Sequence, residues 1–318
     1  MLPSRFLSRR LAGAALSCIV VAAPRATSAQ MYAPPSAPVV VTTEWLAAHL
    51  KDPNLVLLHV GQQKEYDAGH IPGARYVKLD DISVSSHDHD QDKGLMLEMP
   101  QPDSLRARLE ALGISNDSRV IVYYGNDWVS PATRVIFTLD YAGLGASAAL
   151  LDGGMPAWKA EKRALSTELP RKSRGQLAAL RIKPIVVDAA WVRSRIGRPN
   201  FHLIDGRAAA FYDGVESGGP RKGHIAGAKS LPYTEIAGDD LHLRSAEELR
   251  ALFARAGVVP GDTVVAYCHI GQQATAVLFA ARSIGHPVLL YDGSYQDWSR
   301  RGADYPVDDP RAGKTSAQ

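Results

Sequence analysis

The chain is poor in cysteine, because its 318 residues include only two, Cys18 and Cys268. Two cysteines allow at most one disulfide, which excludes the disulfide-rich class of small secreted folds. Long hydrophobic runs are lacking as well, since no apolar stretch approaches the roughly 18 residues of a membrane-spanning helix. With 46% hydrophobic residues the chain can bury a sizeable core, and its length suggests about two domains.

A marked excess of charge of one sign is also lacking. The formal net charge is +3, but residues 1–29 contribute four arginines and no acidic residue. Without that segment, 32 basic residues face 33 acidic ones, a net charge of about −1. This balance argues against nucleic acid or an anionic membrane as the main partner.

Residues 1–29 have the pattern of an export signal. Three arginines in the first ten residues precede an apolar run over residues 11–23, and Thr27–Ala29 offers a small-residue cleavage site. As a helix the run covers about 20 Å, less than the roughly 30 Å core of a bilayer. We predict a signal peptide and an exported, periplasmic protein with no stable membrane association after cleavage. An uncleaved anchor is the alternative.

Removal of the signal leaves Cys268 as the only thiol. An oxidising compartment is a poor place for a thiol without a role, which favours a functional cysteine. The alternative is a buried, inert cysteine. The residues around Cys268 decide between the two.

The sequence contains an internal repeat. A Gly-His-Ile-x-Gly-Ala motif begins at Gly69 and again at Gly223, and an Asp-Gly pair precedes both Trp158 and Trp298. Two apolar runs of strand length recur in the same order. These motifs indicate a tandem duplication. The corresponding segments are 55–58 and 201–204, 69–74 and 223–228, 120–123 and 264–267, and 151–158 and 291–298.

Each copy alternates predicted strands and helices. In the second copy, Ser245 and Glu248 form a capping box that begins a helix over residues 245–256. A strand at 264–267, a helix from about residue 273 and a strand at 288–291 follow. Strands separated by single helices predict, in each copy, a mostly parallel sheet with helices on both faces. The predicted parts are a signal peptide at 1–29, an N-terminal domain at 38–160, a linker at 161–183, a C-terminal domain at 184–308 and a tail at 309–318.

Cys268 follows a predicted strand and precedes a predicted helix. This is the edge of a parallel sheet at which α/β proteins place ligands. The short loop Cys268-His269-Ile270-Gly271-Gln272-Gln273 can turn its backbone N–H groups toward the sulfur, and the helix N-terminus adds partial positive charge. Both effects favour the thiolate and predict an anion cradle.

These residues together resemble one family. The paired Gly-His-Ile-x-Gly-Ala motifs, Asp205-x-Arg207, the loop of Cys268 after Val-Val-Ala-Tyr, and Tyr-Asp-Gly-Ser with Trp298 resemble the two-domain rhodaneses, the thiosulfate and 3-mercaptopyruvate sulfurtransferases. The resemblance covers about residues 40–308. It implies a sulfurtransferase whose C-terminal domain carries sulfur as a Cys268 persulfide from a small-molecule donor to an acceptor such as cyanide or a thiol.

The resemblance also implies a degenerate, non-catalytic N-terminal domain. In the aligned copies Tyr124 stands opposite Cys268, and His59 and Gly61 stand opposite Asp205 and Arg207. Cysteine supplies the covalent intermediate itself, so we expect no metal and no organic cofactor. The predicted site consists of Cys268 as the catalytic residue, Asp205 as structural support, and His269, Ile270, Gly271, Gln272, Gln273, Arg207 and Arg221 as substrate-binding residues.

Several assignments stay open. Asp205 and Arg207 also fit a structural ion pair, and Arg221 fits a solvated loop. His269 is either a partial substitute for an arginine in oxyanion binding or an exposed bystander. Family members that use mercaptopyruvate have an arginine shortly after the Asp-x-Arg element; Phe211 stands there, which favours thiosulfate as the donor.

Two other features and two rival functions complete the predictions. The tract at residues 87–92 resembles a metal site without a third ligand cluster, and His70 and His224 are interpreted as structural histidines. A cysteine phosphatase would need an arginine where Ala274 stands. A non-catalytic sulfur-binding or partner-binding module is the second rival.

Overall fold

The computed structural model describes residues 39–85, 94–126, 128–171 and 173–312. The predicted signal peptide and the tract at residues 87–92 lie outside the described residues. Within the described ranges, none of the helices combines the length and the apolar character needed to cross a membrane.

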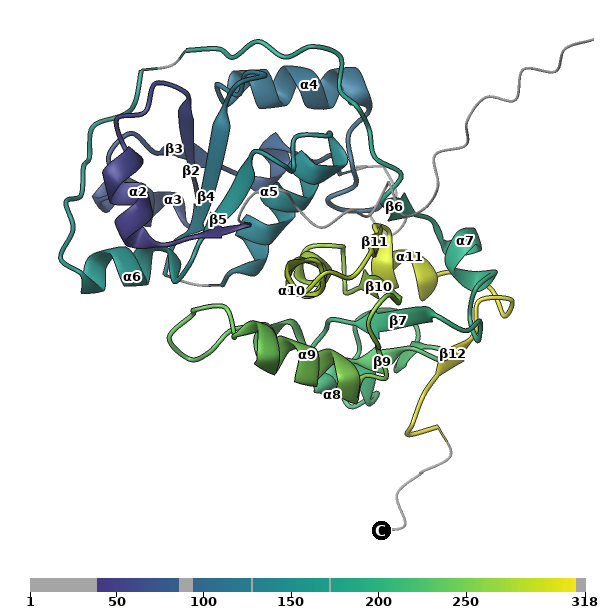
Figure 1. Ribbon diagram of the computed structural model, residues 1–318. Coiled ribbons are helices and arrows are strands. Elements are labelled where there is room, and N and C mark those ends of the chain that lie inside the picture. Colours follow the sequence, from purple (N-terminus) through teal and green to yellow (C-terminus); the bar gives the residue numbers. More distant parts are fainter. Residues whose placement is uncertain (1–38, 86–93, 127, 172, 313–318) are drawn as a thin grey trace, which may run out of the picture. The chain divides into compact units, whose positions relative to one another are not determined.

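The chain folds into two five-stranded sheets with equivalent strand orders (Figure 1). Their strand orders are β1-β5-β4-β2-β3 and β6-β11-β10-β7-β9, and neighbouring strands are parallel throughout both sheets. The predicted α/β class with two mostly parallel sheets is therefore confirmed. A separate antiparallel pair joins β8 (His224–Ile225) and β12 (Val307–Asp308).

The first copy contains five strands and five α-helices among its described residues. The strands are β1 (Val40–Val41), β2 (Leu55–Val60), β3 (Arg75–Val77), β4 (Arg119–Tyr124) and β5 (Ala148–Leu151). The helices are α2 (Thr43–His49), α3 (Gln63–Ala68), α4 (Pro102–Ala111), α5 (Ser130–Tyr141) and α6 (Gly154–Ala160), with a 3-10 turn at Leu79–Asp81.

The second copy repeats this arrangement. Its sheet strands are β6 (Val186–Val187), β7 (Phe201–Asp205), β9 (Lys229–Ser230), β10 (Thr263–Tyr267) and β11 (Val288–Tyr291). Its helices are α7 (Ala189–Arg193), α8 (Ala209–Tyr212), α9 (Ala246–Arg255), α10 (Gln273–Ser283) and α11 (Ser294–Trp298), with a 3-10 turn at Tyr233–Ile236.

Both faces of the first sheet are buried, as alternation along β4 shows. Val120, Val122 and Tyr124 belong to a core shared with α4 and α5, whereas Ile121 and Tyr123 belong to a core shared with α2, α3 and α6. Successive side chains of a strand point to opposite faces, so helices cover this sheet on both sides. Tyr124 therefore ends its strand on the face that carries α5.

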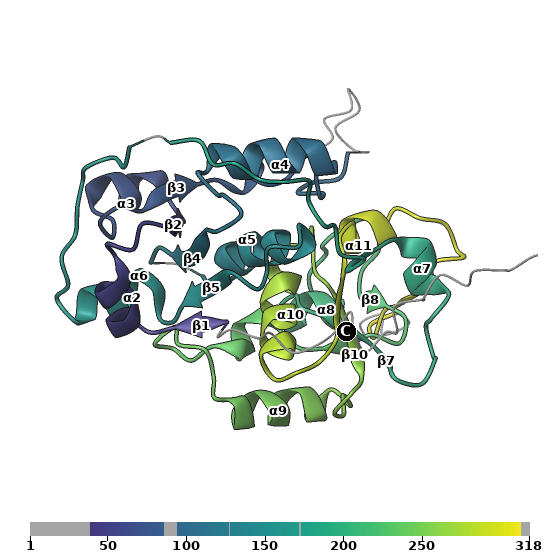
Figure 2. The ribbon, with the colours of Figure 1, turned by 45° about the horizontal axis from the view of Figure 1, so that its top comes forward.

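The predicted elements of the second copy match the observed ones closely. Helix α9 begins after Ser245, whose Oγ accepts from the N–H of Glu248, while the Glu248 carboxylate accepts from the N–H of Ser245 at 2.9 Å. This confirms the predicted capping box. Helix α10 begins at Gln273 as predicted, and residues 274–281 are all buried, on every side of the helix. This burial arises because α10 packs against α5 of the first copy as well as against its own sheet (Figure 2).

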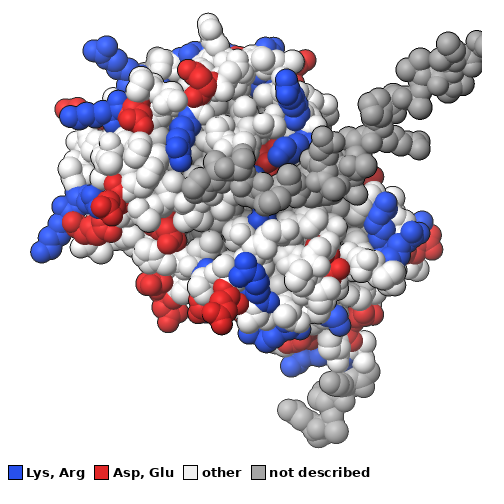
Figure 3. Space-filling model, in the orientation of Figure 1, with Lys and Arg blue, Asp and Glu red and all other residues white. Residues whose placement is uncertain are grey.

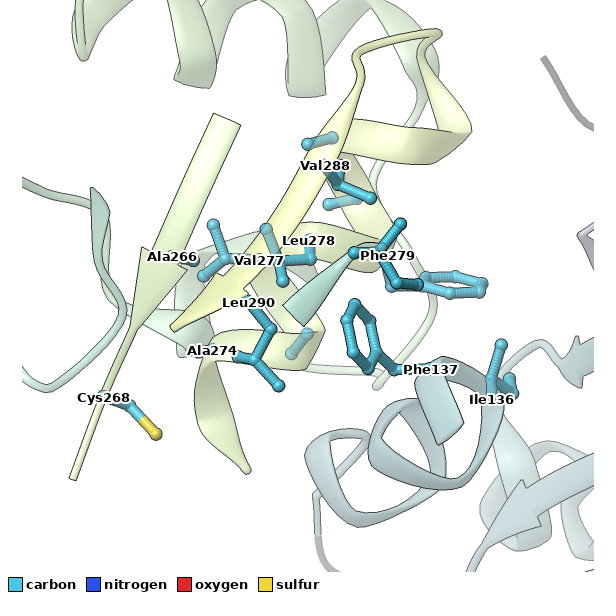
Figure 4. Packing of buried hydrophobic residues seen from close by; sticks show 14 of the residues in the cluster. Ile136, Phe137, Ala266, Cys268, Ala274, Val277, Leu278, Phe279, Val288 and Leu290 are labelled. Atoms are coloured by element: carbon cyan, nitrogen blue, oxygen red, sulfur yellow. The ribbon is translucent and has the colours of Figure 1, made fainter. Parts of the chain in front are cut away.

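The contact between α5 and α10 joins the two copies. The hydroxyls of Thr133 and Thr275 lie 3.0 Å apart, and Figure 4 shows Phe137 of α5 pointing toward Phe279 and Leu290 of the second copy. All three of these apolar residues belong to one continuous core. The two copies therefore share buried hydrophobic surface and a buried polar contact.

Each copy also holds a loop of the other through an aspartate. Asp152, directly after β5, accepts from the N–H of Leu243 at 2.9 Å. Asp292, directly after β11, accepts from the N–H of Met99 at 2.8 Å. The aspartate after the equivalent strand of each copy thus accepts a backbone hydrogen bond from a loop of the other copy.

The histidines of the two Gly-His-Ile motifs have matching structural contacts. Tyr66 stacks on His70 with ring centroids 3.9 Å apart, and Tyr212 stacks on His224 at 3.6 Å. In each pair the histidine Nδ1 lies 2.8 Å from the carbonyl oxygen of the stacked tyrosine. These contacts support the interpretation of both residues as structural histidines.

Charged side chains of both signs are interspersed on the face shown in Figure 3. Some charged side chains of the chain are paired, as in the contact of Arg163 with Glu161 at 2.5 Å and of Arg301 with Asp297 at 2.9 Å. Exposed pairs of this kind stabilise the fold by only about 0–1 kcal/mol each. The view agrees with the balanced charge of the composition.

Candidate active site

Cys268 directly follows β10, at the carboxyl end of a central strand, and it is completely buried. Its N–H donates to Ser294 Oγ at 3.2 Å, and its carbonyl accepts from the N–H of Tyr295 at 2.9 Å. Ser294 has a left-handed backbone with φ of 52°. The first turn of α11 thereby fixes the backbone on both sides of the cysteine.

Residues 268–272 form the loop between β10 and α10, and Gln273, the last residue of the predicted loop, is the first residue of α10. Gly271 lies at the turn of this loop with φ of +82°, and a Cβ there would lie 2.9 Å from Arg134 Nη1 and 2.9 Å from the carbonyl oxygen of Asp292. Glycine is required by the backbone conformation and by the space together. Gln272 donates from its amide to Ser130 Oγ of the first copy at 3.2 Å.

Asp205 and Arg207 form the ion pair that the sequence left open. Both are completely buried, and Arg207 donates from Nε at 2.9 Å and from Nη2 at 2.6 Å to the two oxygens of the Asp205 carboxylate. Tyr267 of β10 donates to the same carboxylate at 2.7 Å, and the guanidinium lies 4.0 Å from the ring centroid of Tyr295. These contacts tie the end of β7 to the end of β10. The predicted part of Arg207 in substrate binding stays a prediction.

Arg221 is held by backbone carbonyls. Its Nε, Nη1 and Nη2 donate to Ser299, Tyr305 and Trp298 at 3.1, 2.8 and 2.6 Å. Two of these carbonyls lie at the C-terminal end of α11, where a cation is favourable. This geometry accounts for Arg221 as a support of α11, and nothing in it favours the predicted role in substrate binding.

His269 lies between aromatic and cationic neighbours. Its ring meets Phe211 edge-on at 4.5 Å between centroids. Burial, and then the positive charge of Arg207, lower the pKa of His269 below its ordinary value. The imidazole is therefore neutral at neutral pH, which disfavours His269 as a charged substitute for an arginine.

Two aromatic residues that the sequence did not predict lie close to the site. Trp128 of the first copy meets Tyr233 of the second edge-on, with ring centroids 5.5 Å apart. Burial, first of all, raises the pKa of Tyr233, and a hydrogen bond with Gln273 lowers it. Tyr233 thus lies beside Gln273, where the cysteine loop enters α10. No sequence signal identified it, because it is separated from the loop along the chain.

The equivalent place in the first copy is closed by tyrosine. Tyr124 donates to the carbonyl oxygen of Leu241 at 2.6 Å, and a Cβ on Gly154 would lie 2.7 Å from the tyrosine ring. His59 replaces the aspartate; it is fully buried, and both its ring nitrogens are without a hydrogen-bond partner in the described part of the chain. The aligned positions agree with the predicted loss of nucleophile and ion pair.

Beyond the residues around Cys268, the described part of the chain contains a cavity but no cluster of metal ligands. A cavity of about 530 Å³ lies in the first copy beside the linker, away from the residues around Cys268; its lining includes Tyr66, Arg75, Leu112 and Arg171. Over the described residues, no group of three or more His, Cys, Asp or Glu side chains has a metal-binding arrangement.

Comparison with known proteins supplies the family. The model of the rhodanese-like domain matches residues 42–161 and again 188–301. A protein of Pseudomonas aeruginosa named "Probable 3-mercaptopyruvate sulfurtransferase" is 33% identical over 272 residues, 81% of this chain and 94% of the relative. The thiosulfate sulfurtransferase of Azotobacter vinelandii is 29% identical over 276 residues, 86% of this chain and 98% of the relative. The crystal structure of YnjE has a TM-score of 0.75 at 25% identity, covering 85% of this chain and 68% of that one.

The matches cover both copies of the repeat, in the order and with the spacing that the duplicated motifs predict. Family membership rests on the double match together with the relative at 33% identity. The chain belongs to the rhodanese family of sulfurtransferases, as two rhodanese-like domains in tandem.

Proposed function

We propose that the chain moves sulfane sulfur from thiosulfate to a nucleophilic acceptor, cyanide or a thiol, through a persulfide on Cys268. The observation that carries this proposal is the position of Cys268, at the end of β10 and at the start of a five-residue loop that leads into α10. In the described part of the chain it is the only cysteine.

The proposed reaction has two balanced steps. The Cys268 thiolate attacks the outer sulfur of thiosulfate, a new S–S bond forms, and the old S–S bond breaks with its electron pair leaving on sulfite. The acceptor then attacks the outer sulfur of the persulfide. Cyanide leaves as thiocyanate, and the electron pair of the broken bond restores the Cys268 thiolate. No oxidant or reductant is consumed.

The surroundings of Cys268 support the anionic forms that this cycle needs. Backbone N–H groups of a short loop and the N-terminal end of α10, an eleven-residue helix, both favour negative charge. Burial removes competing water, so these dipoles act at a lower effective dielectric constant. The same groups favour the thiolate, the persulfide and a bound oxyanion.

3-Mercaptopyruvate is the second candidate donor. The name of the Pseudomonas aeruginosa relative favours it. Phe211, which lies against His269, weakens the case for mercaptopyruvate, because it offers no cation to the carboxylate of that donor. Initial rates with the two donors, at the same cyanide concentration, separate them. A higher kcat/KM for mercaptopyruvate would replace the donor in the proposal and leave the persulfide intact.

The decisive test compares Cys268→Ser with Tyr124→Phe, which alters the equivalent position of the other copy. We expect no thiosulfate:cyanide turnover in Cys268→Ser and turnover close to wild type in Tyr124→Phe. Mass spectrometry after thiosulfate treatment should show one added sulfur atom in wild type and in Tyr124→Phe, but not in Cys268→Ser. Full turnover in Cys268→Ser would refute the proposal. A persulfide without turnover to any small acceptor would instead indicate a sulfur-binding module.

A further inference from the structure

A buried arginine of the non-catalytic copy reaches the cysteine loop of the catalytic copy. Arg134 lies in α5, and its side chain is completely inaccessible to solvent. Its Nη1 donates to the carbonyl oxygen of Gly271 at 3.1 Å and to Asp292 Oδ1 at 2.7 Å. Its Nη2 donates to the carbonyl oxygen of Leu97. One guanidinium thus joins three segments that are distant in the sequence.

The contact with Gly271 fixes the orientation of a peptide group in the loop. A peptide bond is planar and trans, so the N–H of Gln272 points opposite to the Gly271 carbonyl. Holding that carbonyl on Arg134 therefore also fixes the direction of a loop N–H. Free rotation of this peptide is further limited because Gly271 has φ of +82° and little space beside Arg134 and Asp292.

The arginine is itself held by its neighbours. Asp292 accepts from Arg134 with one oxygen and from the N–H of Met99 with the other. Glu98 brings a second carboxyl group near this pair, and its Oε1 is buried without a partner in the described ranges. A buried charge pair with this many hydrogen bonds has one well-defined geometry, which suits it to hold a loop in place.

We propose that Arg134, supplied by the non-catalytic copy, is a positioning residue for the loop of Cys268. It acts through the Gly271 carbonyl and keeps the loop N–H groups directed at the sulfur. The inference rests on the proposed function of Cys268. It also gives the first copy a part in the chemistry of the second without any contact to the reacting atoms.

The test uses a matched control at the same interface. Arg282 of α10 pairs with Asp140 of α5 at 3.1 Å and also crosses between the copies, but among the described residues its hydrogen bonds and ion pair go to α5 and Gly145 rather than to the cysteine loop. We expect Arg134→Gln to lower kcat for thiosulfate:cyanide transfer by about 10- to 100-fold with a smaller change in KM. Arg282→Gln should keep the wild-type kcat. Arg134→Lys should recover part of the loss.

A second measurement does not depend on turnover. The rate at which iodoacetamide alkylates Cys268 is followed against pH, and for Arg134→Gln we expect its midpoint at higher pH because fewer dipoles favour the thiolate. If wild type shows no transfer at all, the proposed function fails while alkylation still tests the positioning.

Loss of the arginine leaves the Asp292 carboxylate buried without its partner, so folding of the variant must be checked. The double variant Arg134→Gln/Asp292→Asn removes both charges together and serves where Arg134→Gln does not fold. A folded variant of either kind with the kcat and the alkylation profile of Arg282→Gln would overturn the proposal.

Discussion

The hydroxyl of Tyr124 donates to the carbonyl oxygen of Leu241 2.6 Å away, from the strand-end position that Cys268 occupies in the other copy. The first copy therefore uses this position for a contact with the second copy. Burial, first of all, raises the pKa of the Tyr124 phenol, which stays a neutral donor. The position aligned with Cys268 thus carries a hydrogen bond between the two copies.

Glu98→Gln should change how stability depends on pH. Burial, and then Asp292, raise the pKa of Glu98 to about 8, although Arg134 lowers it. A carboxyl whose pKa is raised in the folded state loses its stabilising contribution as the pH rises from its unfolded value toward about 8. The amide of glutamine imitates the protonated carboxyl and does not ionise. Between these pH values the free energy of unfolding of the variant should therefore rise by at least about 1 kcal/mol relative to that of wild type. Urea unfolding at several pH values measures the difference.

The control is Glu110→Gln. The N–H of Leu177, and then Arg174, lower the pKa of Glu110, so its ionisation differs between the folded and unfolded states only in more acidic solution. Its difference from wild type should stay flat between about pH 5 and 8. If the free energies of unfolding of Glu98→Gln and Glu110→Gln changed with pH in the same way, Glu98 would not be the source of the pH dependence of stability.

His59→Phe should stabilise the chain in mild acid. Burial, and then the charge of His70, lower the pKa of His59 to about 4. Stability is lost as the pH falls from about 6.5 toward 4, because the unfolded chain binds a proton that the folded chain excludes. Phenylalanine also removes two buried ring nitrogens that have no hydrogen-bond partner in the described part of the chain, which should raise the free energy of unfolding by about 1–3 kcal/mol. Thermal or urea unfolding should show a larger gain at low than at neutral pH. An equal gain at both would assign the whole effect to packing.

The Asp205–Arg207 pair should show strong coupling. Asp205→Asn leaves a buried arginine without its counter-charge, and a loss of about 3–5 kcal/mol in the free energy of unfolding is expected. Arg207→Gln should cost a similar amount. The double variant removes both charges and should cost clearly less than the two single losses added together. Additive losses in a double-mutant cycle would contradict the ion pair as the source of the effect.

The sequence predicted those parts of the site that are contiguous. Cys268 and its loop were identifiable because a strand, a glycine-containing turn and a helix follow one another within a few residues. The capping box of Ser245 and Glu248 was identifiable for the same reason. Asp205 was recognised by its motif, and the structure supplied its partners, among them Tyr267 of the neighbouring strand.

The rest depends on pairings between distant segments. Arg134 lies 137 positions from Gly271, and no local pattern distinguishes it from an arginine on an exposed helix face. The burial of α10 on all sides follows from α5, which a helical pattern in one segment does not reveal. Arg221 looked available for substrate in a polar loop, yet its donors are engaged by carbonyls up to 84 positions away.

The reciprocal aspartates make the interface resemble that of a symmetric dimer built within one chain. In a true homodimer every substitution appears twice, so the two ends of such an interface are obliged to change together. In this chain the two ends of the interface, at Asp152 and at Asp292, are encoded by different residues, so a substitution at one end leaves the other unchanged. Asp152 meets His242 at 2.9 Å where Asp292 meets Arg134, and these partners are not alike. Covalent linkage thus allows the two ends of a symmetric interface to differ, with an arginine on the aspartate at one end and a histidine on the aspartate at the other.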